Sequence, residues 1–109
     1  MQDGLYRAQF ATPIGAGFGV VVIDGTNFRG GDSAMAYVGT LEERGNQLVA
    51  SIRTFRHSNV VGLGLSVLGA DNVTFAVAGI AANDTSVRLA GTVPGTNLEF
   101  SVTLDRIAS

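Results

Sequence analysis

Apolar and polar residues alternate along several stretches of the chain, with the period of two that is typical of a β-strand with one buried face. The clearest stretch runs from Leu98 to Leu104, where every second residue is apolar and those between are polar. Residues 6–10, 73–78 and 86–91 show the same alternation. No window carries an apolar stripe at the helical period of about 3.6 residues, so the chain is expected to be all-β.

Turn-forming residues separate these stretches at intervals of roughly ten residues, as in an antiparallel meander. Examples are Asp24-Gly25 and Arg44-Gly45-Asn46, and Asp-Gly favours the positive φ of a tight hairpin. Because barrel closure removes exposed edges, about eight short strands predict a single β-barrel domain over residues 1–109. The expected strands lie near residues 4–11, 15–23, 26–29, 34–42, 47–56, 73–81, 86–92 and 97–106.

The large apolar residues of these strands are expected to form the core or to line the barrel interior. They are Tyr6, Phe10, Phe18, Tyr37, Phe75, Leu89, Phe100 and Val102. The alternate glycines Gly15, Gly17 and Gly19 share one strand face, where another backbone can approach closely. A β run follows these glycines and their spacing is G-x-G-x-G, so they do not form a dinucleotide-binding loop.

Residues 58–70 form the one long connection, which is mostly apolar and contains no charged residue. A segment of this kind either caps the core or forms a self-association surface. The residues expected to do so are Val60, Val61, Leu63, Leu65, Val67 and Leu68.

The amino-acid composition excludes several classes of protein function. Hydrophobic residues make up 46% and charged residues 15%, which excludes a disordered chain. A pI near 5.1 and a net charge of −2 argue against direct nucleic-acid binding. With no Cys, one His and no catalytic constellation, we expect a non-enzymatic protein without metal or cofactor. No signal-peptide pattern or bilayer-spanning stretch is visible, so a cytoplasmic protein without membrane contact is expected.

Few polar residues are candidates for a site. Asp32 follows Gly30-Gly31 and is expected to accept backbone N–H bonds in that turn. Arg53, Phe55 and His57 share a strand face that can stack on a nucleotide, but without a further basic patch an ordinary strand end is favoured. The adjacent carboxylates of Glu42 and Glu43 lie before a turn, either as a solvated hairpin tip or as an acidic contact for a partner.

The first half of the chain resembles the GrlR family, which is named for a bacterial negative regulator of type III secretion. The matching residues are Asp3-Gly4-Leu5-Tyr6 with Phe10, the Gly-rich second strand, Gly30-Gly31-Asp32, and the run from Ser33 to Leu41. The spacing from Gly-Gly-Asp through Tyr37 to Gly39 is the most specific part. The resemblance implies a small lipocalin-like barrel, usually dimeric, with an apolar interior.

The resemblance also implies a function. The named regulator binds a helix-turn-helix transcription activator through a run of four acidic residues in a hairpin loop, and keeps it off DNA. The corresponding place here is Glu42-Glu43-Arg44-Gly45, where two acids remain and an Arg replaces a third. The leading expectation is a homodimeric regulatory binding protein that sequesters a protein partner. The alternative is a carrier or sensor of a small apolar ligand inside the barrel.

Overall fold

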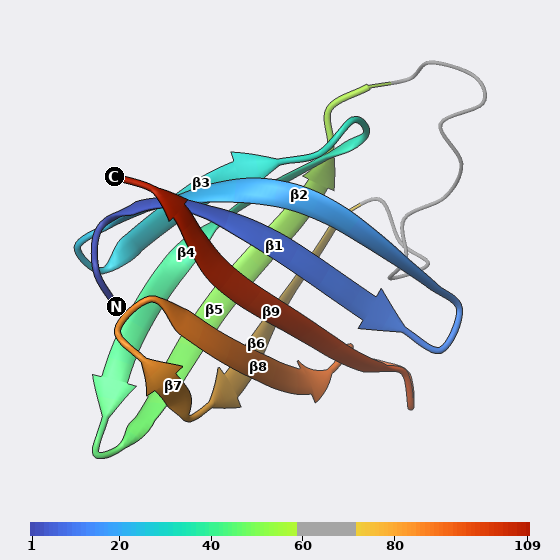
Figure 1. The fold of residues 1–109 in the computed structure, drawn as a ribbon. Coiled ribbons are helices and arrows are strands. Elements are labelled where there is room, and N and C mark those ends of the chain that lie inside the picture. Colours follow the sequence, from blue (N-terminus) through green and yellow to red (C-terminus); the bar gives the residue numbers. More distant parts are fainter. Residues whose placement is uncertain (59–71) are drawn as a thin grey trace.

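The computed structural model describes residues 1–58 and 72–109, and every regular element within them is a β-strand (Figure 1). Each strand pairs antiparallel with its neighbours. The elements are β1 (Gly4–Thr12), β2 (Gly15–Asp24), β3 (Asn27–Gly31), β4 (Met35–Arg44), β5 (Gln47–Arg56), β6 (Asn72–Gly79), β7 (Ala81–Asn83), β8 (Ser86–Thr92) and β9 (Glu99–Ala108).

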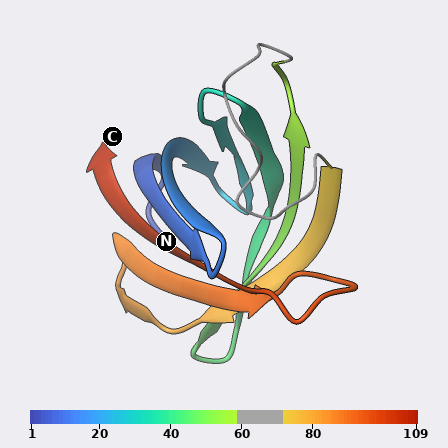
Figure 2. The same cartoon turned by 90° about the vertical axis from the view of Figure 1, so that its right-hand side faces the viewer.

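The strands form a closed barrel around a common interior (Figures 1 and 2). Consecutive strands pair from β1 to β6, and β9 lies between β1 and β8. A pairing of β6 with β8, at Ala78 and Ala90, closes the ring. The short β7 is an extra strand that pairs with β8 alone. The expected antiparallel barrel of eight strands is therefore confirmed.

The closing seam depends on two glycines. A Cβ atom on Gly91 of β8 would collide with the backbone carbonyl of Ala76 in β6. A Cβ atom on Gly79 of β6 would collide in the same way with the carbonyl of Arg88 in β8. Because glycine has no Cβ, the two backbones can approach closely enough to pair.

One expected strand is divided. The sequence predicts a single strand over residues 73–81, whereas β6 ends at Gly79 and β7 begins at Ala81. The chain turns away from the seam after Gly79 and pairs with the start of β8, where Ala81 lies opposite Val87. Alternation alone cannot show that break, because Val77, Gly79 and Ala81 keep the period of two across it.

Seven of the eight residues expected to be buried are in the core. They alternate with exposed residues along their strands, as one buried face requires. The rings of Phe10, Phe75 and Phe100 contact one another: Phe100 lies edge-on to Phe75 at 5.1 Å and stacked on Phe10 at 6.4 Å between centroids. Such contacts add to the stabilisation from apolar burial.

Phe18 is the exception, and the prediction that it is buried is wrong. It is 63% exposed and shares the outer face of β2 with Val20 and Val22. The inner face of β2 carries Gly17 and Gly19 instead, followed by the buried Val21 and Ile23. The sequence places these glycines correctly on one face, but that face is the interior one.

The glycines leave interior space that two rings from other strands occupy. A Cβ atom on Gly17 would lie 2.8 Å from the ring of Phe10, and one on Gly19 would lie 3.1 Å from the hydroxyl oxygen of Tyr37. The rings of Phe10 and Tyr37 meet edge to face, with centroids 5.6 Å apart. Aromatic side chains from β1 and β4 thus fill the volume that Phe18 was expected to fill.

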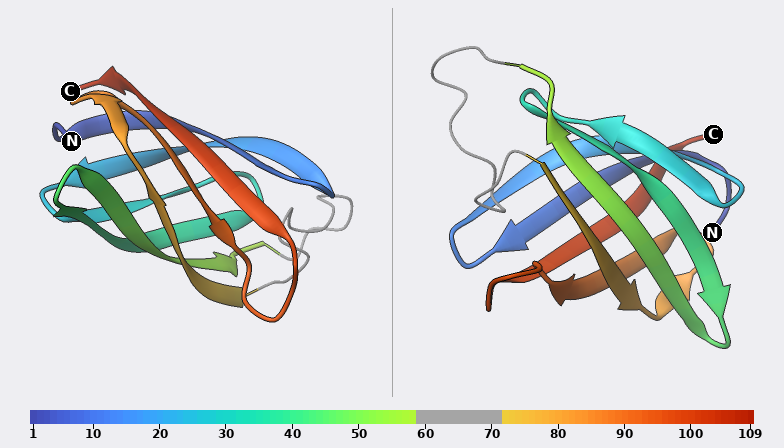
Figure 3. Two further views of the ribbon diagram at one scale, coloured as in Figure 1. Left: turned by 90° about the horizontal axis from the view of Figure 1, so that it is seen from below. Right: turned by 180° about the vertical axis from the view of Figure 1, so that it is seen from behind.

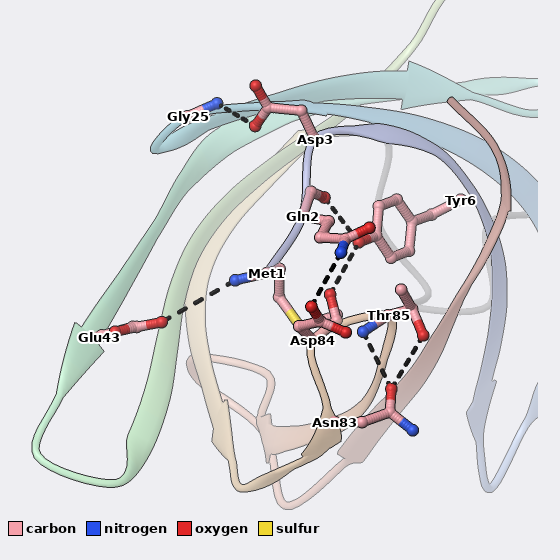
Figure 4. Close-up of polar contacts among 9 residues, drawn as sticks. All are labelled: Met1, Gln2, Asp3, Tyr6, Gly25, Glu43, Asn83, Asp84 and Thr85. Atoms are coloured by element: carbon pink, nitrogen blue, oxygen red, sulfur yellow. Dashed lines mark hydrogen bonds and ion pairs between the residues drawn. The ribbon is translucent and has the colours of Figure 1, made fainter.

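The N-terminal residues close one end of the barrel (Figure 4). The side chain of Met1 is 1% exposed, and the Tyr6 hydroxyl donates a 2.6 Å hydrogen bond to the Gln2 carbonyl. The backbone N–H of Gln2 donates to the Asp84 carbonyl at 2.8 Å, which ties this segment to the turn between β7 and β8. The expected cap or interface residues Val60, Val61, Leu63, Leu65, Val67 and Leu68 lie outside the described residues.

The close approach of β6 and β8 at Gly91 predicts an effect on stability. Gly91→Ala should lower the free energy of unfolding by about 1–3 kcal/mol, because the added methyl group meets backbone that has no room to move. Ala11→Val, at an exposed position of β1 away from this seam, is the control and should change it by less than about 0.5 kcal/mol. Urea denaturation followed by circular dichroism measures both. Wild-type stability in Gly91→Ala would show that the seam does not need glycine.

Candidate ligand-binding cavity

The barrel encloses a cavity of about 280 Å³. Its wall is mostly apolar and is built from residues of β1, β2, β3, β4, β5, β8 and β9. Deep lining residues such as Ala8, Ala50 and Leu89 are almost fully buried. The small side chains of Ala8 and Ala50 leave space that larger residues would fill.

The cavity opens at the end of the barrel away from the N-terminus. Ala16, Phe18 and Ser33 also line it, and all three are exposed. They belong to the first part of β2 and to the connection between β3 and β4. Figure 3 shows that the hairpin between β1 and β2 and the N-terminus lie at opposite ends of the barrel. One end is therefore filled by Met1 and Tyr6, and at the other the described residues leave the cavity open.

Asp32 organises the polar side of this opening. Its Oδ1 atom accepts the backbone N–H of Ala34 at 2.9 Å and that of Met35 at 2.7 Å. The prediction that Asp32 accepts backbone hydrogen bonds in the turn is confirmed. Its Oδ2 atom accepts a short hydrogen bond from the hydroxyl of Tyr37. Asp32 thus fixes both the turn into β4 and the orientation of a buried tyrosine.

Tyr37 is held in its neutral form. Burial raises the pKa of the Tyr37 hydroxyl well above its ordinary value, and the hydrogen bond to the nearby Asp32 carboxylate raises it further. The hydroxyl group therefore keeps its proton at neutral pH and donates it in the hydrogen bond to Asp32, while its oxygen lone pairs remain available as acceptors.

Thr54 is the one buried polar residue of the described core, and it also lines the cavity. It is 4% exposed, and its Oγ1 atom makes no hydrogen bond within the described part of the chain. Thr54 lies directly opposite Tyr37 in the pairing of β4 with β5. A buried hydroxyl without a partner is unfavourable, so this position calls for an explanation.

Near the end of β5, Arg53 and Phe55 lie on the outer face of the barrel, opposite the cavity. The guanidinium of Arg53 lies 4.6 Å from the ring centroid of Phe55, a cation–π contact within the strand. The backbone N–H of His57 donates to the Ala34 carbonyl at 3.0 Å, and its Nε2 atom is 2.9 Å from the Asp32 carbonyl oxygen. These contacts agree with an ordinary strand end. Within residues 1–58 and 72–109, no cluster of His, Cys, Asp or Glu is arranged to hold a metal ion.

Glu42 and Glu43 lie at the tip of the hairpin between β4 and β5, at the closed end of the barrel. Their side chains are 54% and 76% exposed. The Glu42 carboxylate is 3.3 Å from the Arg44 guanidinium. The Glu43 carboxylate is 3.9 Å from the Met1 amino group (Figure 4). Both acids point into solvent, and each has a positive group nearby.

The sequence did not indicate Thr54 or the pairing of Asp32 with Tyr37 as parts of a site. A signal was present for Thr54, since it continues the inward series of Leu48, Ala50 and Ile52 as a polar residue. The pairing of Asp32 with Tyr37 gives no such signal, because it depends on the path of the turn into β4.

The chain matches no protein-family model and no curated protein sequence. The GrlR resemblance and the homodimer therefore stay predictions. None of the described segments forms a helix with the length and apolar character that a bilayer crossing requires.

The raised pKa of Tyr37 predicts a pH dependence of stability. A tyrosine whose pKa is higher in the folded state stabilises the fold fully below its unfolded pKa of about 10, and this contribution is lost as the pH rises above that value. The free energy of unfolding should then fall by at most about 1.4 kcal/mol per pH unit for this one group. Burial also raises the pKa of Tyr6, so some dependence persists without Tyr37.

Urea titrations between pH 8 and pH 11 on wild type and Tyr37→Phe measure this difference. The wild type should lose more stability than Tyr37→Phe over the range above pH 10, and the two should run parallel below pH 9. Parallel curves over the whole range would mean that Tyr37 ionises as easily in the folded protein as in the unfolded chain.

Proposed function

We propose that the protein binds a small, largely apolar molecule inside its barrel, as a carrier or sensor of that molecule. The observation that carries this proposal is the cavity of about 280 Å³, which is apolar, filled at one end by Met1 and, among the described residues, open at the other. Concave apolar cavities with a few convergent polar groups are the usual form of small-molecule sites. Ligand binding in the barrel was the alternative function expected from the sequence. The geometry favours it over partner binding by the acidic tip, that is, by Glu42 and Glu43 at the hairpin between β4 and β5.

The size of the cavity limits the ligand. An apolar cavity of about 150 Å³ takes up benzene, so a cavity about twice as large suits a molecule of roughly ten to twelve non-hydrogen atoms. Volumes near 300 Å³ are at the small end for ligand sites. A long lipid chain does not fit wholly inside such a space. A compact molecule with one or two rings, or a short branched chain, matches it best.

The lining supports binding rather than chemistry. Among the described lining residues, Asp32 provides the one carboxyl group, and both of its oxygens already accept hydrogen bonds. Three of its roughly four acceptor positions fix the turn into β4 and the Tyr37 hydroxyl, so this carboxyl group has a structural role. The proposed role is therefore non-enzymatic.

Naphthalene, which has ten carbon atoms and no polar group, tests the cavity alone. Wild type should bind it with a dissociation constant in the micromolar range, measured by calorimetry or by shifts of amide resonances. Ala50→Leu places three more carbon atoms in the cavity and should weaken binding at least about tenfold.

The matched control is Ala76→Leu, because Ala76 is exposed on the outer face of β6 and does not line the cavity. It should bind naphthalene as wild type does. Folding of all three proteins is checked by circular dichroism. A folded wild type that binds no compact apolar probe, or that binds one equally well after Ala50→Leu, would contradict the proposal.

A second candidate function is the sequestration of a protein partner by the acidic tip. The observation in its favour is that Glu42 and Glu43 are both exposed at one hairpin end. A DNA-binding activator presents a basic surface, because it has to meet phosphates. Opposite charge would then increase the association rate and the specificity. Arg44, at 3.3 Å from Glu42, weakens the local field, so the expected effect is modest.

Glu42→Ala combined with Glu43→Ala should change the free energy of unfolding by less than about 1 kcal/mol, because both groups are exposed. Binding to a DNA-binding partner captured on the immobilised wild type should weaken several-fold, and more at low salt, where screening is least. Asp24→Ala with Glu99→Ala removes the same charge from other exposed positions and serves as the control. Equal loss in both double variants would assign the effect to net charge and not to the tip.

A further inference from the structure

We infer that the ligand of the cavity carries one neutral hydrogen-bonding head group, such as a hydroxyl, carbonyl or amide, which binds at Thr54. The inference rests on the proposed ligand-binding function and adds the chemical class of the ligand. Two observations support it: a buried, unpartnered hydroxyl in the cavity wall, and a wall whose one charged group among the described residues is the Asp32 carboxylate.

Thr54 provides the first part of the argument. Its side chain is 4% exposed and lines the cavity, and its Oγ1 atom has no hydrogen-bond partner among the described residues. The neighbouring inward residues of β5 are apolar, and a valine would have the same shape here without the buried hydroxyl. The hydroxyl can both donate and accept a hydrogen bond, so a ligand group at this point can complete it.

Tyr37 provides the second part. It faces Thr54 across the pairing of β4 with β5, and both side chains line the cavity. Directly opposed residues have Cβ atoms about 5 Å apart, but the Tyr37 hydroxyl reaches away from Thr54 toward β2, where a Cβ atom on Gly19 would lie 3.1 Å from its oxygen. Because the Tyr37 hydroxyl already donates its hydrogen bond to Asp32, its oxygen can only accept a hydrogen bond from a ligand. Thr54 therefore provides the hydroxyl that can receive one small polar group, and Tyr37 offers no second donor beside it.

The charges of the wall decide between a neutral and a charged head group. The described lining residues include no Arg or His, and the chain has no Lys. A carboxylate head would meet the Asp32 carboxylate, and the Tyr37 hydroxyl could not donate to it because its hydrogen bond already goes to Asp32. An ammonium head would compete with the hydrogen bonds that already occupy both oxygens of Asp32. A buried charge without a free partner is strongly disfavoured, so a neutral head group fits best.

Three probes with one ring system separate these possibilities: naphthalene without a head group, 2-naphthol with a neutral hydroxyl, and 2-naphthoate with a carboxylate. Wild type at pH 7 should bind 2-naphthoate at least about tenfold more weakly than 2-naphthol. Thr54→Val should weaken the binding of 2-naphthol about fivefold, the equivalent of one net hydrogen bond, and leave naphthalene binding unchanged or tighter. Calorimetry measures all three affinities.

Two controls accompany Thr54→Val. Thr54→Ser keeps the hydroxyl and should keep the preference for 2-naphthol. Thr40→Val makes the same change at an exposed position of β4 and should alter nothing. If naphthalene binds but Thr54→Val leaves the ratio of 2-naphthol to naphthalene affinity unchanged, the head-group inference is wrong while the binding function stands. If no probe binds the folded protein, the proposed function itself fails.

Discussion

The closure between β6 and β8 is the constraint on which the rest of the structure depends. These strands pair at a single position, Ala78 with Ala90, and their approach requires that Gly79 and Gly91 carry no side chain. Without this contact the sheet would end in two exposed edges, and its inward residues would face solvent. Closure therefore creates the interior, turns an amphipathic sheet into a core, and protects an apolar chain with few charges from pairing edge to edge.

Within the closed barrel, side-chain size decides which part is core and which part is cavity. Phe75 and Phe100 pack against each other, and Met1 with Tyr6 fills one end. Toward the other end, the small residues Ala8 and Ala50 occupy inward positions, and the space they leave is part of the cavity. A cavity lowers stability through the contacts that its lining lacks, so its presence in a small domain is itself a reason to consider a ligand.

The polar groups divide between the two ends of the barrel. Asp32, Tyr37 and Thr54 lie at the cavity, where low polarity gives each hydrogen bond or its absence a large effect. Glu42 and Glu43 lie at the hairpin tip of the closed end, where solvent screens them. The two candidate functions thus use separate surfaces, and substitutions at one end leave the other intact.

Much of the fold follows from the sequence alone, because strand alternation and turn residues are local properties. They predicted an all-β barrel, the position of most strands, the burial of seven of eight residues and the role of Asp32 in its turn. Phe18 was misplaced because glycines and an unbroken apolar run surround it, so alternation does not mark the inner face there. Only strand pairing fixes that face. The cavity, the seam at Gly91 and the orphaned hydroxyl of Thr54 likewise arise only when strands distant in sequence enclose one volume.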